Sequence, residues 1–418
     1  MVDREFDIVL FGATGFVGTL AAAHLATAAG PEVRVALAGR SLTRLAAVRG
    51  QLGEAARNWG LVEVDATDAE GLLKLASRTS VLATTVGPYA RYGREVVRAA
   101  AEEGTDYADL TGEVLFVRWT LDEIAGRARE TGARIVHSCG FDSIPSDLGV
   151  LLTAGRAAAD GQGTLEDTAL VVRSMKGGIS GGTIDSFRNQ VITADHDPAA
   201  RRVLNDPYAL SPRRADEPTM RPLRPGPAGR PRRLVPVERD PETGRWMGPF
   251  VMADYNARLV RLSNTLTDWS YGRALAYREV TDFGSGPAGP VFAAGMAISL
   301  GALRGGMSWA ASRAVLDRFL PRPGQGPSAR QRTAGQFRME ISGTTTTGAH
   351  YRTTVAAEHD PGYGGTAIML VQSALCLALD GPRLPNRSGV LTPATAMGDV
   401  LVDRLRARGF TFEVERVD

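Results

Sequence analysis

A glycine-rich turn near the start of the chain constrains the fold more than any other feature. Gly12, Gly15 and Gly18 are spaced Gly-x-x-Gly-x-x-Gly and directly follow the apolar run at residues 6–11. Glycine is needed where a backbone turns tightly, approaches a pyrophosphate or lets a helix pack on a strand. Apolar residues at helical spacing follow the turn. The order of strand, turn and helix predicts a dinucleotide-binding loop with the pyrophosphate at the helix N-terminus.

Strand and helix patterns then alternate through residues 1–150. Apolar runs predict six strands, at residues 6–11, 33–38, 61–64, 81–86, 107–110 and 134–138. Helical patterns separate these runs, and right-handed crossovers place such helices on both faces of a parallel sheet. The fold class is therefore α/β, with a Rossmann doubly wound parallel sheet.

The length of 418 residues exceeds what one hydrophobic core usually serves and predicts two domains. Residues 1–150 are expected to form a Rossmann domain that binds a dinucleotide, and residues 151–385 an α+β substrate domain with antiparallel strands around residues 344–355. Proline and nine arginines in residues 207–249 predict a long exposed excursion. Residues 386–418 are expected to form a C-terminal helix that packs back on the Rossmann domain.

A formal net charge of +2 gives no general attraction to nucleic acid, and we expect no nucleic-acid partner. Residues 283–303 carry no charge, but only residues 291–303 form a continuous apolar run, which is too short to span a bilayer. This run is either a buried helix or a contact with an acyl chain or a membrane surface. The acidic N-terminus lacks an export signal, so the protein is expected to be cytoplasmic, and a homo-oligomer is expected.

The spacing of cysteines, histidines and lysines does not support a disulfide, a metal site or the mechanism of short-chain dehydrogenases. Cys139 and Cys376 do not form a Cys-x-x-Cys pair, and we expect no disulfide. The histidines lack paired metal-ligand spacing, so no metal site is expected; they are His24, His137, His196, His350 and His359. Short-chain dehydrogenases need a tyrosine four residues before a lysine, and neither Lys74 nor Lys176 has one.

The cofactor is expected to be NADPH. The second predicted strand ends at Arg40 and Ser41, where an acidic residue would bind the ribose hydroxyls of NAD. Residues 39–53 contain no carboxylate, whereas a guanidinium fork and a hydroxyl suit a 2′-phosphate. Asp65 either lies near the adenine or begins a turn. The expected cofactor residues are Gly12, Ala13, Thr14, Gly15, Phe16, Val17, Gly18, Arg40, Ser41, Asp65, Val86, Gly87 and Pro88.

Three residues are candidates for catalysis. Residues 86–88 follow the fourth strand, where Rossmann folds place the nicotinamide half of the cofactor. The adjacent Tyr89 either orients the substrate or donates a proton to it, or else its ring only packs in the protein core. Asp142 and Ser143 follow the sixth strand, and they either cap the next helix, with Pro145 in its first turn, or contact substrate.

Four segments resemble the saccharopine-dehydrogenase-like superfamily of oxidoreductases. They are residues 11–16 (FGATGF), 84–89 (TTVGPY), 105–113 (TDYADLTGE) and 139–147 (CGFDSIPSD). Within this superfamily, residues 389–394 (GVLTPA) and 396–399 (AMGD) extend the resemblance to the trans-acting enoyl reductases of mycobacterial type. The resemblance covers nearly the whole chain.

The resemblance implies NADPH-dependent reduction of a carbon-carbon double bond in a polyketide-derived lipid intermediate of phthiocerol type. The substrate would be a lipid-like enoyl thioester carried by a polyketide synthase that lacks its own reductase. Hydride would add to the β-carbon while an acid protonates the α-carbon. The double bond is expected near residues 86–89, with the acyl tail toward residues 291–303.

Two other functions stay open. One is a saccharopine-type amino-acid dehydrogenase, in which Arg173, Lys176 and Arg188 would bind a zwitterion. The other is a non-catalytic protein that keeps the cofactor fold and acts at lipid surfaces, because of residues 291–303.

Overall fold

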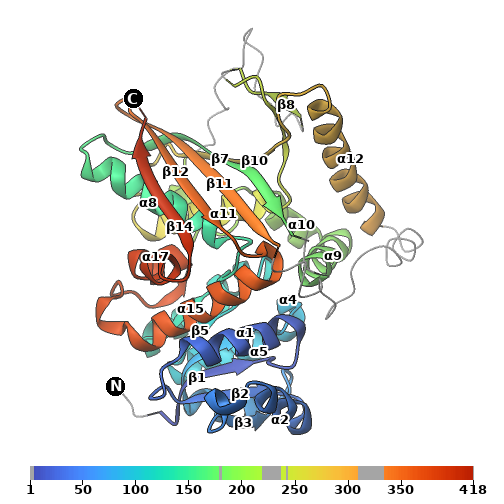
Figure 1. The fold of residues 1–418 in the computed structure, drawn as a ribbon, viewed down its shortest axis with the longest axis vertical. Helices are drawn as coiled ribbons and strands as arrows, with labels where there is room; N and C mark the ends of the chain where they lie inside the picture. Colours follow the sequence, from blue (N-terminus) through green and yellow to red (C-terminus); the bar gives the residue numbers. More distant parts are fainter. Residues whose placement is uncertain (1–3, 178–180, 219–236, 242, 309–333, 418) are drawn as a thin grey trace.

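The computed structural model describes residues 4–177, 181–218, 237–241, 243–308 and 334–417. Within these ranges the strands form two seven-stranded sheets. Figure 1 shows the sheet of the N-terminal half at the bottom and the second sheet above it, with helices between the two.

The first sheet is parallel throughout its described strands, in the order β13-β6-β5-β4-β1-β2-β3. The strands are β1 (Phe6–Phe11), β2 (Val35–Gly39), β3 (Gly60–Glu63), β4 (Thr79–Thr84), β5 (Asp106–Ala108), β6 (Arg134–Val136) and β13 (Gly389–Leu391). The predicted fold class, a Rossmann parallel sheet with a second α+β part, is confirmed, and the second part is built on a mixed sheet. The strand that sequence analysis did not predict is β13, which returns from the far end of the chain to pair with β6.

Both faces of the first sheet are buried, as expected of a parallel sheet. Along β1, Ile8 and Leu10 pack on the side of α1, whereas Val9 and Phe11 pack on the side of α3 and α5. Helix α15 lies beside α1 and covers β4 and β5. The helices around this sheet are α1 (Phe16–Ala28), α2 (Leu42–Gln51), η1 (Gly53–Ala56), α3 (Ala69–Ser77), α4 (Tyr89–Tyr92), α5 (Arg94–Glu103), α6 (Val114–Glu123), α7 (Ala125–Thr131) and α15 (Thr366–Leu379).

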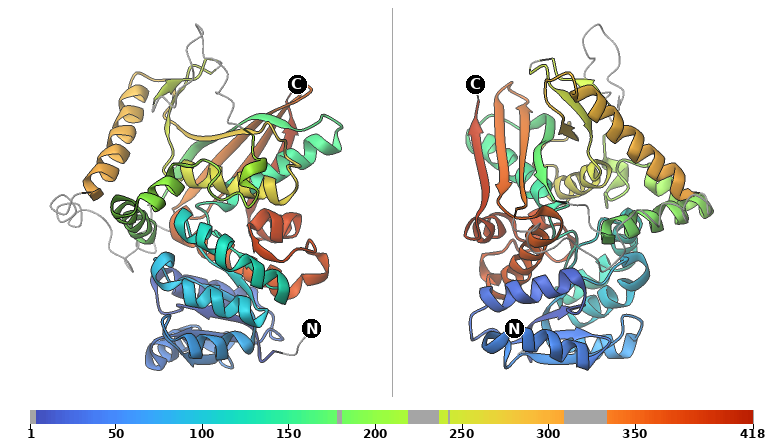
Figure 2. Two further views of the ribbon diagram at one scale, coloured as in Figure 1. Left: turned by 180° about the vertical axis from the view of Figure 1, so that it is seen from behind. Right: turned by 45° about the vertical axis from the view of Figure 1, so that its right-hand side comes forward.

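The second sheet has the order β14-β12-β11-β7-β10-β9-β8 among the described strands and is antiparallel except for the pair β7 and β10. Its strands are β7 (Leu165–Lys176), β8 (Glu238–Arg239), β9 (Trp246–Pro249), β10 (Ala276–Asp282), β11 (Gln336–Thr345), β12 (His350–Ala357) and β14 (Phe410–Arg416). Helices α8 (Ile144–Ala159) and α11 (Ala253–Leu266) pack against this sheet and against each other. Figure 2 shows α8 (green) and α11 (yellow) beside the second sheet, at the same height as its strands.

The remaining described helices surround the second sheet and its junction with the first. They are α9 (Gly181–His196), α10 (Pro198–Asn205), η2 (Arg214–Asp216), α12 (Gly289–Ser308), η4 (Pro361–Gly365), η5 (Gly381–Arg383), α16 (Pro393–Ala396) and α17 (Gly398–Arg406). Figure 1 shows α9 and α12 at the edge of the molecule, beside the second sheet.

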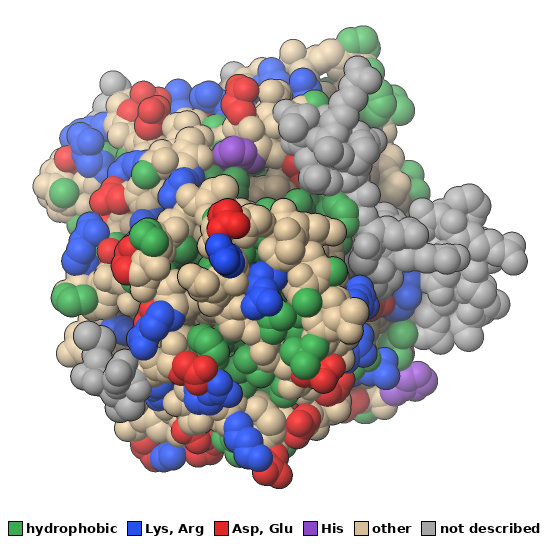
Figure 3. Space-filling view, turned by 60° about the horizontal axis from the view of Figure 1, so that its bottom comes forward, with side chains coloured by type: hydrophobic (Ala, Val, Ile, Leu, Met, Phe, Trp, Pro, Cys, Tyr) green, Lys and Arg blue, Asp and Glu red, His purple; other side chains and the backbone are tan. Residues whose placement is uncertain are grey.

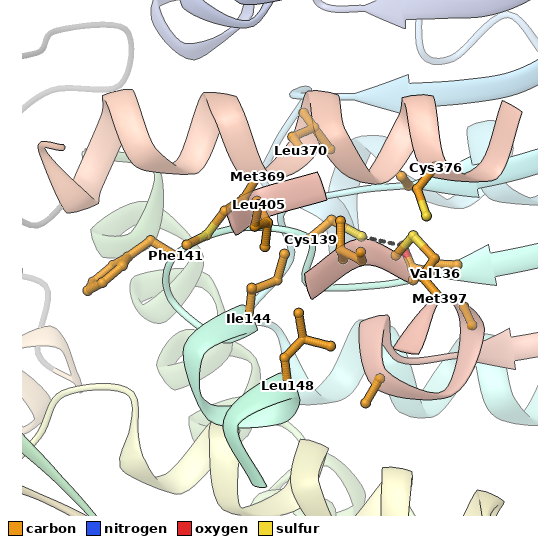
Figure 4. Close-up of a cluster of buried hydrophobic side chains, with 14 of the residues drawn as sticks. Val136, Cys139, Phe141, Ile144, Leu148, Met369, Leu370, Cys376, Met397 and Leu405 are labelled. Carbon is orange, nitrogen blue, oxygen red and sulfur yellow. Dashed lines mark hydrogen bonds between the residues drawn. The ribbon is translucent and has the colours of Figure 1, made fainter. Parts of the chain in front are cut away.

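A buried cluster joins the two halves where α15, α8 and α17 meet (Figure 4). Phe141 and Ile144 enter it from the turn after β6, and Met369 and Leu370 enter it from α15. Cys139 and Cys376 are buried free thiols in the same cluster. Because one core is shared, the segments on either side of residue 150 are packed together without an open linker between them.

The C-terminal segment is more divided than the expected single helix. It contains β13, α16, α17 and β14, so it adds one strand to each sheet. Thr392 caps α16 with its side chain, and Gly398 at a φ of 53° separates α16 from α17. Glycine adopts this left-handed backbone without a steric penalty, which explains the break.

The arginine-rich and apolar segments also differ in part from expectation. Residues 219–236 of the expected excursion lie outside the described residues, while its described ends contain buried Tyr208 and Leu210 and the paired strands β8 and β9. In α12, Val291 and Ile298 are 70% and 71% exposed, so the interpretation of this run as a buried helix is wrong for its outer face.

The distribution of charge on one face and the most apolar helical stretch are as follows. On the face shown in Figure 3, acidic and basic side chains are interspersed rather than gathered by sign. Among the described residues, one helical stretch, Pro361–Leu379, is long and apolar enough to cross a membrane, but 72% of its apolar window is buried in the protein core.

Candidate functional site

The glycine loop between β1 and α1 leaves no room for a side chain at Gly12 or Gly18. A Cβ atom on Gly18 would lie 2.1 Å from the carbonyl oxygen of Gly12, and one on Gly12 would lie 2.7 Å from Cγ2 of Val86. Gly12 also has a φ of 90°. Gly15 occupies the N-cap of α1 without a side-chain cap, and the first turn carries no acidic residue. The positive end of the α1 dipole therefore faces no acidic side chain of its own first turn, and the loop fits a pyrophosphate.

The side of the loop that faces α2 carries more positive charge than the sequence motif indicates. Arg40 is largely exposed, and its Nε lies 4.0 Å from Oδ2 of Asp65. Ser41 caps α2 by accepting a hydrogen bond from the backbone N–H of Arg44, and the Arg44 guanidinium reaches the carbonyl oxygen of Thr14 at 3.5 Å. Asp65 has a pKa below its usual value, mainly because Thr67 donates a hydrogen bond to it. Arg44 joins the loop to α2, a role that sequence analysis missed.

Residues 86–88 follow β4 and lie against the glycine loop, where the backbone N–H of Val86 donates to Oγ1 of Thr84. Tyr89, next in the chain, is buried, and burial raises the pKa of its hydroxyl well above the usual value. That hydroxyl donates to the carbonyl oxygen of Thr84 and accepts from the backbone N–H of Leu110. The ring therefore ties the ends of β4 and β5 together, which corresponds to the packing alternative for Tyr89.

A small cavity of about 50 Å³ opens at the carboxyl ends of β5 and β6, beside the first turn of α1. Its lining comes from both halves of the protein. The lining residues are Val17, Leu110, Thr111, Ser138, Gly140, Asp142, Ser143, Gly362 and Thr366. The cavity touches the phosphate-loop helix at one end and the two candidate catalytic residues Asp142 and Ser143 at the other.

A larger cavity of about 330 Å³ adjoins the small one, since Leu110 and Asp142 line both. Helices α9, α10 and α11 form most of its wall. Its apolar lining consists of Leu110, Val114, Phe187, Val191, Ala194, Leu204, Val251 and Met252. Arg201 and Arg258 also line it, but their guanidinium groups donate to backbone carbonyl oxygens. The other polar residues of the lining are Asp142, Ser186, Gln190, Asp195, Asn205, Asp254 and Tyr255. The wall is therefore mixed, and its apolar surface is the larger share.

A buried polar cluster holds the turn after β6. Oδ1 of Asp109 accepts hydrogen bonds from the backbone N–H groups of Thr111 and Ser138, and Oδ2 lies 2.8 Å from Nδ1 of His137. Ser138 has a φ of 66°, a conformation that side-chain-bearing residues seldom adopt. Its hydroxyl donates to the carbonyl oxygen of Thr111 and pairs with the hydroxyl of Tyr255 at 2.5 Å. Asp109 thus fixes the position of a strained serine between the cavities.

The turn at Asp142 and Ser143 is held by α11. Ser143 lies at the N-cap position of α8, as expected, but its hydroxyl donates to Oδ1 of Asn256 instead of capping the helix. The amide nitrogen of Asn256 donates to the carbonyl oxygen of Asp142 and to the carboxyl group of Glu279. Burial raises the pKa of Glu279 to about 7. The hydrogen bonds of this network run from β10 to the two candidate catalytic residues.

Glu113 connects the cofactor side to α9. It is fully buried and accepts hydrogen bonds from the backbone N–H groups of Tyr89 and Ala90 and from the hydroxyl of Ser186. Burial raises the pKa of its carboxyl group, while the Ser186 hydrogen bond lowers it. In the described part of the chain, no group of three His, Cys, Asp or Glu side chains is arranged to hold a metal ion.

Sequence analysis did not single out several residues that the fold brings to the cavities. Ser138 carried one detectable signal, since it ends a predicted strand at the carboxyl edge of the sheet. No sequence signal marked Tyr255, Asn256 or Ser186 as part of the site, because their helices, α11 and α9, follow Ser138 by more than 40 residues along the chain.

Comparison with known proteins gives a consistent family. Residues 8–136 match the saccharopine dehydrogenase NADP binding domain. A protein of Mycobacterium tuberculosis is 49% identical over 421 residues, which cover 99% of this chain and 98% of its own length. The trans-acting enoyl reductases of Mycobacterium ulcerans and Mycobacterium bovis are each 46% identical, with 99% of both chains covered.

The structural comparison agrees on the fold. Apo saccharopine dehydrogenase (L-Glu forming) of Saccharomyces cerevisiae superposes with a TM-score of 0.53 at 14% identity, over 98% of this chain and 99% of that one. At this identity the likeness concerns the fold alone. The resemblance and the NADP cofactor predicted from the sequence are confirmed. The chain belongs to the trans-acting enoyl reductase family and is an NADP-dependent oxidoreductase with the saccharopine dehydrogenase fold.

Proposed function

We propose that the protein reduces the carbon-carbon double bond of a polyketide-derived enoyl thioester with NADPH. The observation that carries the proposal is the pair of adjoining cavities at the carboxyl ends of β5 and β6, one beside the phosphate loop and one with an apolar wall. Ligands of open α/β sheets bind at this edge.

The proposed cofactor site starts at the glycine loop. Residues 12–18 bind the pyrophosphate at the positive N-terminal end of α1, and Arg40, Ser41 and Arg44 surround the 2′-phosphate. Asp65 borders the adenosine end, and residues 86–88 form the wall beside the nicotinamide. When bound there, NADPH supplies a hydride to the substrate.

The proposed substrate site is the larger cavity. None of residues 291–303 appears among its described lining, so we place the acyl tail along α9, α10 and α11 rather than toward α12. The thioester end lies toward Leu110 and Asp142, where the two cavities meet. Each buried methylene contributes about 0.8 kcal/mol, so affinity should rise with acyl length until the cavity is filled.

The saccharopine-type alternative fits this wall less well. Arg173, which would bind a zwitterionic substrate, instead pairs with Asp282 at 2.8 Å and with Glu340 at 2.7 Å. Arg188 lies 3.5 Å from Asp185. Neither arginine is among the described residues that line the larger cavity.

The test is NADPH oxidation with enoyl thioesters of increasing acyl length, alongside saccharopine with NADP⁺. We expect turnover of the enoyl thioesters, with KM falling as the acyl chain lengthens. Val191→Trp, in the apolar wall of the larger cavity, should reduce turnover of the longest thioesters more than that of the shortest. Turnover of saccharopine alone would establish the amino-acid dehydrogenase instead.

The partner and any membrane contact belong to the same proposal. The enoyl thioester is delivered by a polyketide synthase that acts with this protein in trans. The exposed apolar face of α12, with Val291, Phe292 and Ile298, supports a peripheral contact with lipid. Co-sedimentation with liposomes tests this contact, and Phe292→Glu should abolish it.

A further inference from the structure

The hydroxyl groups of Ser138 and Tyr255 form a pair between the two cavities. Ser138 lines the small cavity beside the phosphate-loop helix, and Tyr255 lines the larger apolar cavity. Their oxygen atoms are 2.5 Å apart, although the residues are 117 positions apart in the chain. We infer that this pair is the proton donor of the proposed reduction. The inference rests on the proposed function and names the acid that the reaction requires.

The hydrogen bonds set the direction in which a proton moves through the pair. The Ser138 hydroxyl donates to the carbonyl oxygen of Thr111 at 2.8 Å. The single hydroxyl proton of Ser138 is used in this bond. The Tyr255 hydroxyl is therefore the donor, and the Ser138 oxygen the acceptor, in the bond between the two side chains. When a substrate replaces Thr111 as the acceptor, Ser138 gives up its proton and takes the proton of Tyr255.

The pair is held in position by the fold. Asp109 accepts a hydrogen bond from the backbone N–H of Ser138, which keeps this residue at a φ of 66°. Tyr255 is only 5% exposed and sits in the third residue of α11. Strained, fully determined positions of this kind cluster at functional sites. The strain at Ser138 points its hydroxyl at both Thr111 and Tyr255.

The other described hydroxyl groups around the small cavity lack a second hydroxyl behind them. Ser143 donates to Asn256, Thr366 donates to the carbonyl oxygen of Pro361, and the Thr111 hydroxyl accepts from the backbone N–H of Glu113. Tyr89 is not among the described lining of either cavity. The relay of two hydroxyl groups distinguishes Ser138 and Tyr255 from these residues.

The proposed step balances as follows. The β-carbon of the enoyl thioester accepts a hydride from NADPH, and the electron pair of the double bond moves to form an enolate. The α-carbon of this enolate takes the proton of Ser138, and Ser138 takes the proton of Tyr255. The tyrosinate regains a proton from water in the larger cavity. Burial raises the pKa of the Tyr255 hydroxyl, so it stays protonated until the more basic enolate forms.

The test uses Tyr255→Phe and Ser138→Gly, with an α-methyl enoyl thioester as substrate. Glycine removes the hydroxyl group without adding strain at a positive φ. Both variants should lose roughly 10²- to 10⁴-fold in kcat, the usual contribution of a positioned acid, while Kd for NADPH stays within about twofold. The wild type should produce one α-methyl enantiomer. The variants should produce a mixture, because water then protonates the enolate from either side.

Tyr271→Phe is the matched control, because Tyr271 is also a buried tyrosine and its hydroxyl has no hydrogen-bond partner among the described residues. It should retain wild-type kcat and a single enantiomer. The inference would be overturned, and the proposed function left standing, if Tyr255→Phe kept wild-type kcat and produced one enantiomer. If Tyr255→Phe fails to fold, the same result in Ser138→Gly would overturn it. A wild-type protein that reduces no enoyl thioester would reject the proposed function and the inference together.

Discussion

Arg40 and Asp65 should set the preference for NADPH in opposite directions. The Arg40 guanidinium is 78% exposed and lies 4.0 Å from the Asp65 carboxylate. A charge-assisted hydrogen bond to a 2′-phosphate contributes about 1.5–3 kcal/mol, and solvent exposure favours the lower end of that range. Arg40→Ala should therefore weaken NADPH binding about tenfold and leave NADH binding nearly unchanged.

Asp65→Asn should strengthen NADPH binding. A phosphate that contacts Arg40 would lie roughly 7 Å from the Asp65 carboxylate, where water reduces the repulsion of a dianion to about 1 kcal/mol. Screening at physiological ionic strength leaves about half of this value. The variant should bind NADPH about twofold more tightly, and the gain should increase at low salt.

Titration of intrinsic fluorescence with both cofactors, at low and at physiological ionic strength, measures these effects. Arg57→Ala is the control, because this exposed arginine pairs with Glu54 in η1, which follows α2 and precedes β3. It should leave both affinities unchanged. An equal loss of NADPH and NADH affinity in Arg40→Ala, or weaker NADPH binding in Asp65→Asn, would refute the assignment of the 2′-phosphate to this side of the loop.

Three further changes test the loop, the buried carboxyl network and the serine turn. Gly18→Ala should abolish NADPH binding in calorimetry because its Cβ would overlap the Gly12 carbonyl oxygen, whereas Gly155→Ala in α8 meets no described atom within 4 Å and should bind normally. The carboxyl group of Glu279 has a pKa of about 7 in the folded protein, against 4.5 in the unfolded chain. Its protonated form therefore stabilises the folded state fully below pH 4.5, and this stabilisation is lost as the pH rises through 7. This loss is about 3 kcal/mol, and Glu279→Gln should flatten the difference between urea unfolding at pH 5 and at pH 8; an unchanged difference would contradict the shift. Asp109→Ala should lower the free energy of unfolding by about 2–6 kcal/mol, since the buried N–H groups of Thr111 and Ser138 both lose their acceptor, at about 1–3 kcal/mol each. A loss below about 1 kcal/mol in urea unfolding would show that Asp109 does not anchor Ser138.

Sequence analysis found the glycine loop and the turn at Asp142 and Ser143, but not the residues of α9 and α11 that complete the cavities. The glycine loop, Arg40 and the ends of the first strands lie within one stretch of chain, and their roles follow from backbone geometry and charge. The apolar run at residues 291–303 shows the limit of such reasoning. Its composition indicated a helix correctly, but whether that helix would be buried depended on what packs against it, and Val291 and Ile298 are exposed.

The sequence by itself determined the parallel sheet, the phosphate loop and the family. Hydrophobic periodicity and glycine spacing are patterns over a few neighbouring residues, so they can be recognised in the sequence without knowledge of the fold. The tertiary structure decided the return of β13 to the first sheet and the meeting of Ser138 with Tyr255. Both contacts join residues more than 100 positions apart in the chain. They depend on the packing of a shared buried core, which no pattern of neighbouring residues predicts.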